Sequence, residues 1–254
     1  MKSSRVLLSC LLSIVFASAA SAAWVELTDS VSVSSLMDGG SLIFGDKELS
    51  EINLFGFVTG GAIPPDADSV FVQGGLNSVT NDYGLRFNFS WSAISNQIVN
   101  TTLSFKVSIL PGFDDYFIKD VWLDITGASA NGTGGVHIGE TVWDAPFFDP
   151  EGNIIASLSC SKQDGDNGAY LLGYAEFAPL KEIWIHSKDI SVTGGTDGTA
   201  HLSEFFQFYS QIPEPATVVL LATAGVWILT RKKTVCLRGL GGKTNSIVST
   251  RNIF

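Results

Sequence analysis

Leu85-Arg86-Phe87-Asn88-Phe89-Ser90-Trp91 is the stretch of this 254-residue sequence that decides the fold, because apolar and polar residues alternate strictly along it. A period of two places the apolar side chains on one face of a β-strand. Between residues 24 and 211 no segment sustains the helical period of about 3.6 residues. The alternation recurs, with varying regularity, at 25–33, 49–58, 69–73, 103–109, 121–125, 136–142, 154–160, 170–177, 183–187 and 202–209.

Short turn signals separate these segments. Pro-Gly, Asn-Gly and Asp-Gly pairs supply preset or positive φ angles, and they fall at 111–112, 131–132, 164–165, 167–168 and 197–198. The segment 163–168 is predicted to be a hairpin loop. About eleven short strands with glycine-rich connections predict an all-β fold, an antiparallel β-sandwich of jelly-roll type. A closed barrel is the alternative.

The charge is unevenly distributed along the chain. The formal net charge of −10 divides into +2 for residues 1–23, −17 for 24–212 and +5 for 213–254. The acidic central part repels phosphate backbones, which argues against nucleic acid as a partner. The basic ends flank apolar runs, as membrane-targeting segments do. Residues 24–211 are long enough for one domain with its own core.

Residues 1–23 have the three parts of a secretory signal peptide. Lys2 and Arg5 give a charged start, an apolar run follows, and small residues close the segment. Ala20 and Ala22 stand where signal peptidase requires small side chains, so we expect cleavage beside them. The apolar run is too short to remain as a membrane span.

A second three-part pattern occupies 212–233. Pro213-Glu214-Pro215 is followed by an uncharged stretch, 216–230, and then by the basic cluster Arg231-Lys232-Lys233. As a helix the stretch reaches about 22 Å, so spanning a bilayer needs local thinning and snorkelling of its flanks. The basic cluster predicts a cytoplasmic tail and an acidic domain outside the cell.

In this order the tripeptide, the apolar stretch and the basic cluster resemble the sorting signal of PEP-CTERM proteins. The resemblance covers the segment 212–233 and implies recognition by an exosortase-like membrane enzyme, removal of the tail, and delivery to the cell surface or exopolysaccharide matrix. The domain, with its lead-in at 207–211, also resembles the β-rich passengers of this group. The basic extension 234–254 departs from the family pattern and is predicted to be a disordered tail. A plain single-pass anchor is the alternative.

The sequence offers few residues with a chemical signature. It contains no GxSxG, HExxH or GxGxxG motif. Cys160 shares the apolar phase of its segment and is interpreted as a buried small side chain, with a reactive thiol as the alternative. Asp164 and Asp166 lie in a turn rich in oxygen ligands, for which a solvated turn and a weak calcium site are the two interpretations. No other cofactor is predicted.

Three tryptophans fall out of phase with the apolar faces of their strands. Trp122, Trp143 and Trp184 alternate with apolar neighbours and share a face with polar residues, whereas Trp91 is predicted to be in the core. Aromatic rings beside carboxylates are typical of carbohydrate-binding surfaces, so these three are candidate glycan-stacking residues. The alternative is that a bulge shifts the phase or that the outer face is covered.

The sequence thus predicts an exported protein without enzymatic activity, at the cell surface or in the extracellular matrix. The predicted partners are signal peptidase, an exosortase-like enzyme, the membrane through 216–230 and exopolysaccharide. Two alternatives remain, a carbohydrate-binding module and a secreted glycan hydrolase whose carboxylate pair carries no recognisable motif.

Overall fold

The computed structural model describes residues 24–63, 66–146, 149–166 and 171–213. Within these ranges the chain is all-β, and antiparallel strands form two sheets that pack face to face as a β-sandwich around one core. The chain divides into two units, Met1–Ile212 and Pro213–Phe254, and the described residues up to Ile212 belong to the first.

The larger sheet, sheet A, has nine strands among the described residues. Six follow the order β1-β5-β6-β14-β8-β12, while β2 pairs with β5, β9 with β14, and β15 with β8. Their bounds are β1 Trp24–Glu26, β2 Val31–Ser32, β5 Phe71–Asn77, β6 Asp82–Ile94, β8 Tyr116–Ile125, β9 Ala128–Asn131, β12 Leu172–Leu180, β14 Thr199–Tyr209 and β15 Gln211–Pro213.

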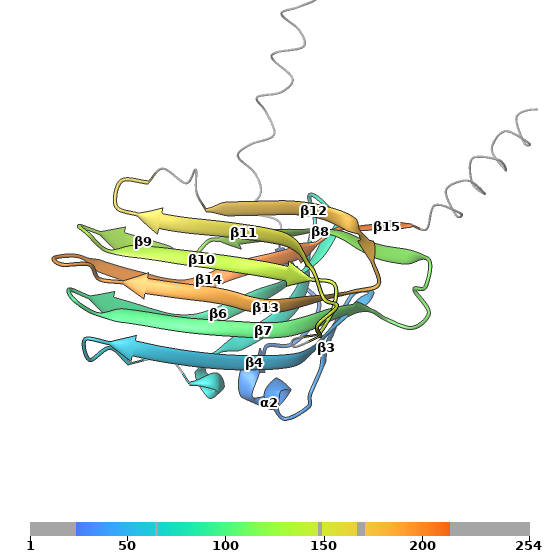
Figure 1. Ribbon diagram of the computed structural model, residues 1–254, viewed down its shortest axis with the longest axis horizontal. Coiled ribbons are helices and arrows are strands. Elements are labelled where there is room, and N and C mark those ends of the chain that lie inside the picture. The colour runs from blue at the N-terminus through green and yellow to red at the C-terminus, as the bar shows by residue number, and fades with distance from the viewer. Residues whose placement is uncertain (1–23, 64–65, 147–148, 167–170, 214–254) are drawn as a thin grey trace, which may run out of the picture. The chain divides into compact units, whose positions relative to one another are not determined.

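The smaller sheet, sheet B, has the order β11-β10-β13-β7-β4-β3. Figure 1 shows β11, β10, β13, β7 and β4 side by side in one layer. The bounds are β3 Leu42–Phe44, β4 Lys47–Thr59, β7 Ile98–Ile109, β10 Gly135–Trp143, β11 Ile154–Gln163 and β13 Glu182–Thr193. Two short helices, α2 Val33–Met37 and η2 Ala67–Ser69, complete the described elements.

Each of the eleven predicted segments overlaps a described strand, which confirms the all-β prediction and the antiparallel sandwich. The alternation did not reveal β3, β9 and β15, which are too short to show a period. The segment 25–33 is divided, because Ser32 caps a helix: its side chain accepts a hydrogen bond from the Ser35 amide. From β4 onward the chain passes repeatedly between the sheets, a connectivity compatible with a jelly roll, and this finer assignment stays a prediction.

The hairpin predicted at 163–168 is wrong. β11 pairs with β10 in sheet B, whereas the next strand, β12, pairs with β8 in sheet A. The segment between them therefore connects the two sheets. Turn residues predict that the chain reverses its direction. They do not predict which strand the next strand pairs with, because pairing depends on contacts between segments that are distant in the sequence.

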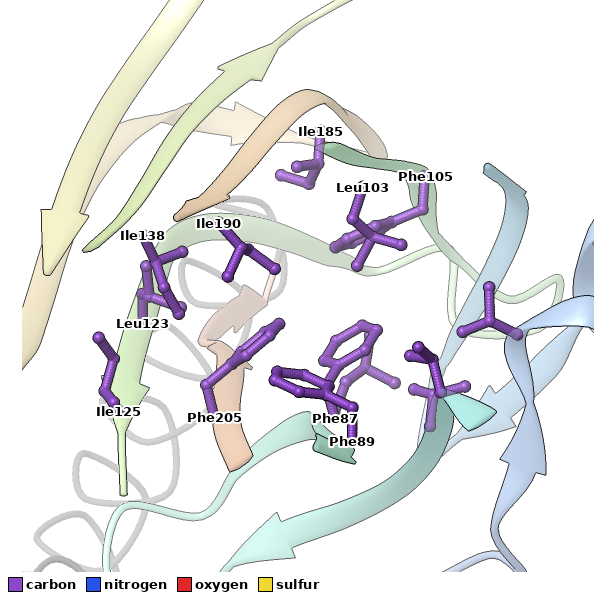
Figure 2. Packing of buried hydrophobic residues seen from close by; sticks show 14 of the residues in the cluster. Phe87, Phe89, Leu103, Phe105, Leu123, Ile125, Ile138, Ile185, Ile190 and Phe205 are labelled. Carbon is purple, nitrogen blue, oxygen red and sulfur yellow. The ribbon is translucent and has the colours of Figure 1, made fainter. Parts of the chain in front are cut away.

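The core lies between the sheets and is rich in aromatic side chains. Figure 2 shows Phe87, Phe89 and Phe205 of sheet A on one side of the core, facing Phe105 of sheet B. The Phe87 and Phe205 rings stack with centroids 4.8 Å apart, and Phe87 lies 5.9 Å from Phe105. Trp91, predicted to be in the core, is 1% exposed. Each fully buried large apolar side chain contributes about 1.5–3 kcal/mol to folding.

Cys160 is buried, as predicted. Its Sγ donates a hydrogen bond to the carbonyl oxygen of Leu123 at 3.3 Å, from β11 in sheet B to β8 in sheet A. Burial raises the pKa of the thiol to about 12, so the thiolate is scarcely populated at neutral pH. The side chain acts as a small packing residue between the sheets.

Several predicted segments lie outside the described residues: the signal peptide 1–23 with Ala20 and Ala22, Glu214 and Pro215 of the tripeptide, the stretch 216–230, Arg231-Lys232-Lys233 and the tail 234–254. Pro213 is the last residue of β15. Of the helices within the described ranges, none combines the length and the apolar character that crossing a membrane would require.

Candidate functional site

Five aromatic side chains make consecutive ring contacts across sheet A, and we call them the aromatic row: Trp24, Phe206, Phe208, Trp122 and Tyr174. The centroid distances along the row are 5.0, 5.7, 6.4 and 6.1 Å. The row crosses β1, β14, β8 and β12 and is separate from the core cluster, so it covers the outer face of the sheet. Most contacts in the row are edge-to-face, a favoured arrangement for aromatic pairs.

Two glycines make room for the row on neighbouring strands. A Cβ at Gly75 of β5 would lie 2.3 Å from the Trp24 ring, and one at Gly84 of β6 would lie 2.4 Å from the Phe208 ring. In the sheet register Gly84 is the partner of Phe208. Glycine weakens a strand interior, and here it lets a bulky ring lie directly over the adjacent backbone.

An open hollow of ≈ 680 Å³ lies at one end of the aromatic row. Its lining includes two aromatic rings, two carboxylates and one ammonium group. The lining residues are Thr80, Asp82, Lys119, Asp120, Trp122, Leu172, Tyr174, Ser210 and Gln211. Tyr174 is 48% exposed and Trp122 is half-buried, so both rings offer surface to a ligand. The volume falls within the range of small-molecule sites, about 300–1,000 Å³.

Hydrogen bonds fix the polar groups of the hollow. The Asp120 carboxylate accepts from the Ser210 amide at 3.1 Å and pairs with the Lys119 ammonium at 3.3 Å. The Tyr174 hydroxyl donates to Glu176 at 2.5 Å. This hydrogen bond is the largest cause that raises the pKa of Tyr174, followed by burial and the nearby Asp120. The phenol therefore stays protonated and available as a polar group at neutral pH.

The other flank of the row is also polar. Arg86 Nε donates to Glu204 at 2.5 Å, and the Thr126 hydroxyl donates to the same carboxylate at 2.6 Å. The Arg86 guanidinium lies 5.9 Å from the centre of the Phe206 ring. Burial, together with the nearby Glu204, raises the pKa of Asp124. An apolar band with hydrogen-bonding groups on both sides suits a ligand that has apolar faces and polar edges.

The three tryptophans proposed from sequence do not share one surface. Trp122 belongs to sheet A, whereas Trp143 and Trp184 are cross-strand partners in sheet B. Trp143 stacks on His186 with centroids 4.6 Å apart. Trp184 is only 9% exposed, and the Lys106 ammonium lies 5.0 Å from its ring centre. The covered-face alternative therefore describes Trp184, and of the three only Trp122 lines the large hollow.

The candidate calcium ligands are used in local turns. The Asp164 carboxylate accepts from the Gly132 amide at 3.1 Å, and the Asp166 carboxylate accepts from the Gln163 amide at 2.6 Å. The Lys162 ammonium donates to the Asp166 carbonyl oxygen. No group of three or more His, Cys, Asp or Glu is placed to hold a metal ion in the part of the chain that the structure describes. A calcium site there stays a prediction.

Sequence reasoning missed a polar cluster inside the core. Glu140 of β10 and Lys188 of β13 are cross-strand partners in sheet B, and both contact Gln207 of β14 in sheet A. We call these three residues the core triad. Two of these residues could have been noticed in the sequence. Glu140 shares the inward face of its strand with Ile138 and Val142 of the core. Gln207 likewise stands between buried aromatic residues.

Comparison with known proteins finds no family model and no curated protein that matches this chain. The enzymatically active domain of tailspike protein 4 of bacteriophage CBA120 is 16% identical, with a TM-score of 0.23. That match covers 63% of this chain and spans 19% of the tailspike domain. Endoglucanase 3 of Trichoderma harzianum, from family GH12, is 12% identical over 63% of this chain and 98% of its own, with a TM-score of 0.19. Scores this low carry no inference about function.

Proposed function

We propose that this chain is an exported, non-enzymatic protein of the cell surface or exopolysaccharide matrix, and that its domain binds polysaccharide at the hollow beside the aromatic row. The observation that carries the proposal is the meeting of Trp122 and Tyr174 with Asp82, Asp120 and Lys119 around one open hollow. Aromatic rings pack on the C–H faces of sugars, while carboxylates and an ammonium group bind hydroxyls.

The proposal of export rests on the sequence. A signal peptide at 1–23, the tripeptide Pro213-Glu214-Pro215 and the basic cluster 231–233 direct the chain to signal peptidase and an exosortase-like enzyme, with transient anchoring through 216–230. Proline stiffens the extended segment in which a sorting enzyme recognises its site. In this proposal the acidic domain, a jelly-roll sandwich, stays soluble outside the cell.

A glycan hydrolase is the second candidate for the same hollow, because two carboxylates line it. Asp82 and Asp120 supply the residue types that glycoside hydrolysis needs. We favour binding without turnover, since Asp120 is held by Lys119 and by the Ser210 amide. Release of reducing ends from a bound polysaccharide would decide for the hydrolase.

Replacing Trp122 or Tyr174 by alanine is expected to weaken polysaccharide binding about two- to tenfold each, since a ring contact contributes about 0.5–1.5 kcal/mol. Affinity is measured for the full chain on an array of bacterial surface polysaccharides. Trp143→Ala is the matched control, because Trp143 lies in the other sheet, and it should bind like the unchanged protein. Equal losses for Trp143→Ala and Trp122→Ala, or no binding by the unchanged protein, would remove the glycan site.

Processing at the tripeptide predicts a new C-terminus near residues 213–215 in the surface form of the protein. Mass spectrometry of the C-terminal peptide from isolated cell envelopes checks this expectation. A surface form that still ends at Phe254 would contradict removal of the tail and support the plain single-pass anchor.

A further inference from the structure

The core triad brings an amine, an amide and a carboxyl group into mutual contact. Lys188 Nζ donates hydrogen bonds to Glu140 Oε2 and to Gln207 Oε1. Gln207 Nε2 donates to Glu140 Oε1 at 2.8 Å. Each side chain therefore contacts the other two, and the amide carbon of Gln207 is one covalent bond from the oxygen that Lys188 contacts.

The triad is sealed from solvent. The side chains of Glu140 and Lys188 are 0% exposed, as is Gln207. The Phe205 ring lies 5.1 Å from the Lys188 amine, and the titratable groups Cys160 and Tyr209 also interact electrostatically with the triad. Burial lowers the pKa of Lys188 against the attraction of Glu140, which favours the neutral, nucleophilic amine.

We propose that Lys188 and Gln207 become joined by an intramolecular isopeptide bond, which the folded domain forms by itself with Glu140 as the proton carrier. The Lys188 ammonium first passes a proton to Glu140, and the neutral Nζ then attacks Cδ of Gln207. Glu140 protonates Nε2 and takes a proton from Nζ, the Cδ–Nε2 bond breaks, and ammonia leaves as ammonium with the remaining proton of Glu140.

This step balances with what the triad contains. A carbon–nitrogen bond forms as another breaks, no electrons are transferred, and no further reactant is needed. Burial protects the product from hydrolysis, because Gln207 and the side chains of Glu140 and Lys188 are 0% exposed. The product ties β13 of sheet B to β14 of sheet A through the centre of the sandwich.

A second buried lysine–glutamine contact in the domain differs from the core triad in how the neighbouring carboxylate is placed. Lys47 is buried, and its Nζ donates to Asp46 at 2.8 Å and to Gln211 Oε1 at 3.0 Å. Asp46 contacts the amine here, but its other carboxylate oxygen, Oδ2, has no hydrogen-bond partner among the described residues. Asp46 therefore does not hold the leaving nitrogen of Gln211 as Glu140 holds that of Gln207, and we expect no bond at this pair.

Peptide mapping of the purified full chain tests the proposal. A glutamate-specific protease cleaves after Glu204, between the two reacting residues, so peptides with Lys188 and Gln207 stay together only if they are linked. The joined species should weigh about 17 Da less than the sum of its parts, the mass of ammonia. Trypsin should fail at Lys188 and cleave at Lys47. Separate peptides of full mass, with Lys188 cleaved by trypsin, would overturn the proposal.

Two variants test the roles within the triad. Glu140→Gln keeps the size of the side chain but removes the proton carrier, and Lys188→Arg removes the nucleophilic amine. Both should give only unlinked peptides, with folding checked by near-ultraviolet circular dichroism. A linked Glu140→Gln protein would show that Glu140 is not the proton carrier, and would overturn the proposal. If neither variant folds, the map of the unchanged protein decides.

Discussion

Replacing Glu140 by alanine is expected to lower the free energy of unfolding by about 3–5 kcal/mol, because it leaves the buried Lys188 without its charged partner. Both side chains are 0% exposed, so the Lys188 ammonium would lose its partner in a site that is closed to bulk solvent. Chemical denaturation followed by tryptophan fluorescence measures the change. Loss of the proposed isopeptide bond would also lower the free energy of unfolding. The peptide map of the unchanged protein separates the two effects, because it shows whether the bond is present.

The surface pair of Lys106 and Glu182 provides the matched control for this prediction. Their charged atoms are 2.8 Å apart, but Glu182 is 45% exposed. Glu182→Ala should therefore cost only about 0–1 kcal/mol, the usual range for exposed pairs. Equal costs for Glu140→Ala and Glu182→Ala would mean that the core triad contributes no more to stability than a solvated contact.

Replacing Gly84 by alanine is expected to cost about 1–3 kcal/mol, as overpacking does elsewhere. The new Cβ would lie 2.4 Å from the Phe208 ring and 2.6 Å from the Gln207 carbonyl oxygen, which is part of the backbone and has little room to move. Phe208 is central to the aromatic row, so the substitution should also weaken binding at the hollow. Thermal unfolding and polysaccharide affinity measure the two effects.

Gly135→Ala is the control for the Gly84 substitution. Gly135 also lies in a strand, β10, but the atom nearest to a Cβ added there would be 3.6 Å away, an ordinary contact. This variant should keep both its stability and its binding. A loss equal to that of Gly84→Ala would show that the cost comes from glycine replacement in a strand and not from the aromatic ring.

The strands were predictable because alternation is a local property of the sequence. Residues 85–91 alternate strictly, and β6 extends over them as Asp82–Ile94. The pairing of strands was not predictable, since it depends on contacts between distant segments. The wrong hairpin at 163–168 shows this limit: the turn residues are present, but β12 joins sheet A.

A bulge accounts for one residue that the pattern missed in the core triad. In β13 the register shifts between Ile185 and Lys188, so Lys188 occupies an inward position that strict alternation from Ile185 would assign to Ser187. Nothing in the local pattern therefore indicates that Lys188 meets Glu140. The aromatic row was missed for another reason, because its members lie on four separate strands. Only Trp122 stood out, through its neighbouring carboxylates.

The pairing of β6 with β14 has a consequence for how the chain acquires its structure. Ser92 and His201, which are hydrogen-bonded side by side in sheet A, lie 109 positions apart in the sequence. Topologies with such distant pairing fold slowly, typically over milliseconds to seconds. A chain that emerges N-terminus first cannot complete the sandwich before β14 has emerged, so the sandwich forms only once all of its strands are available.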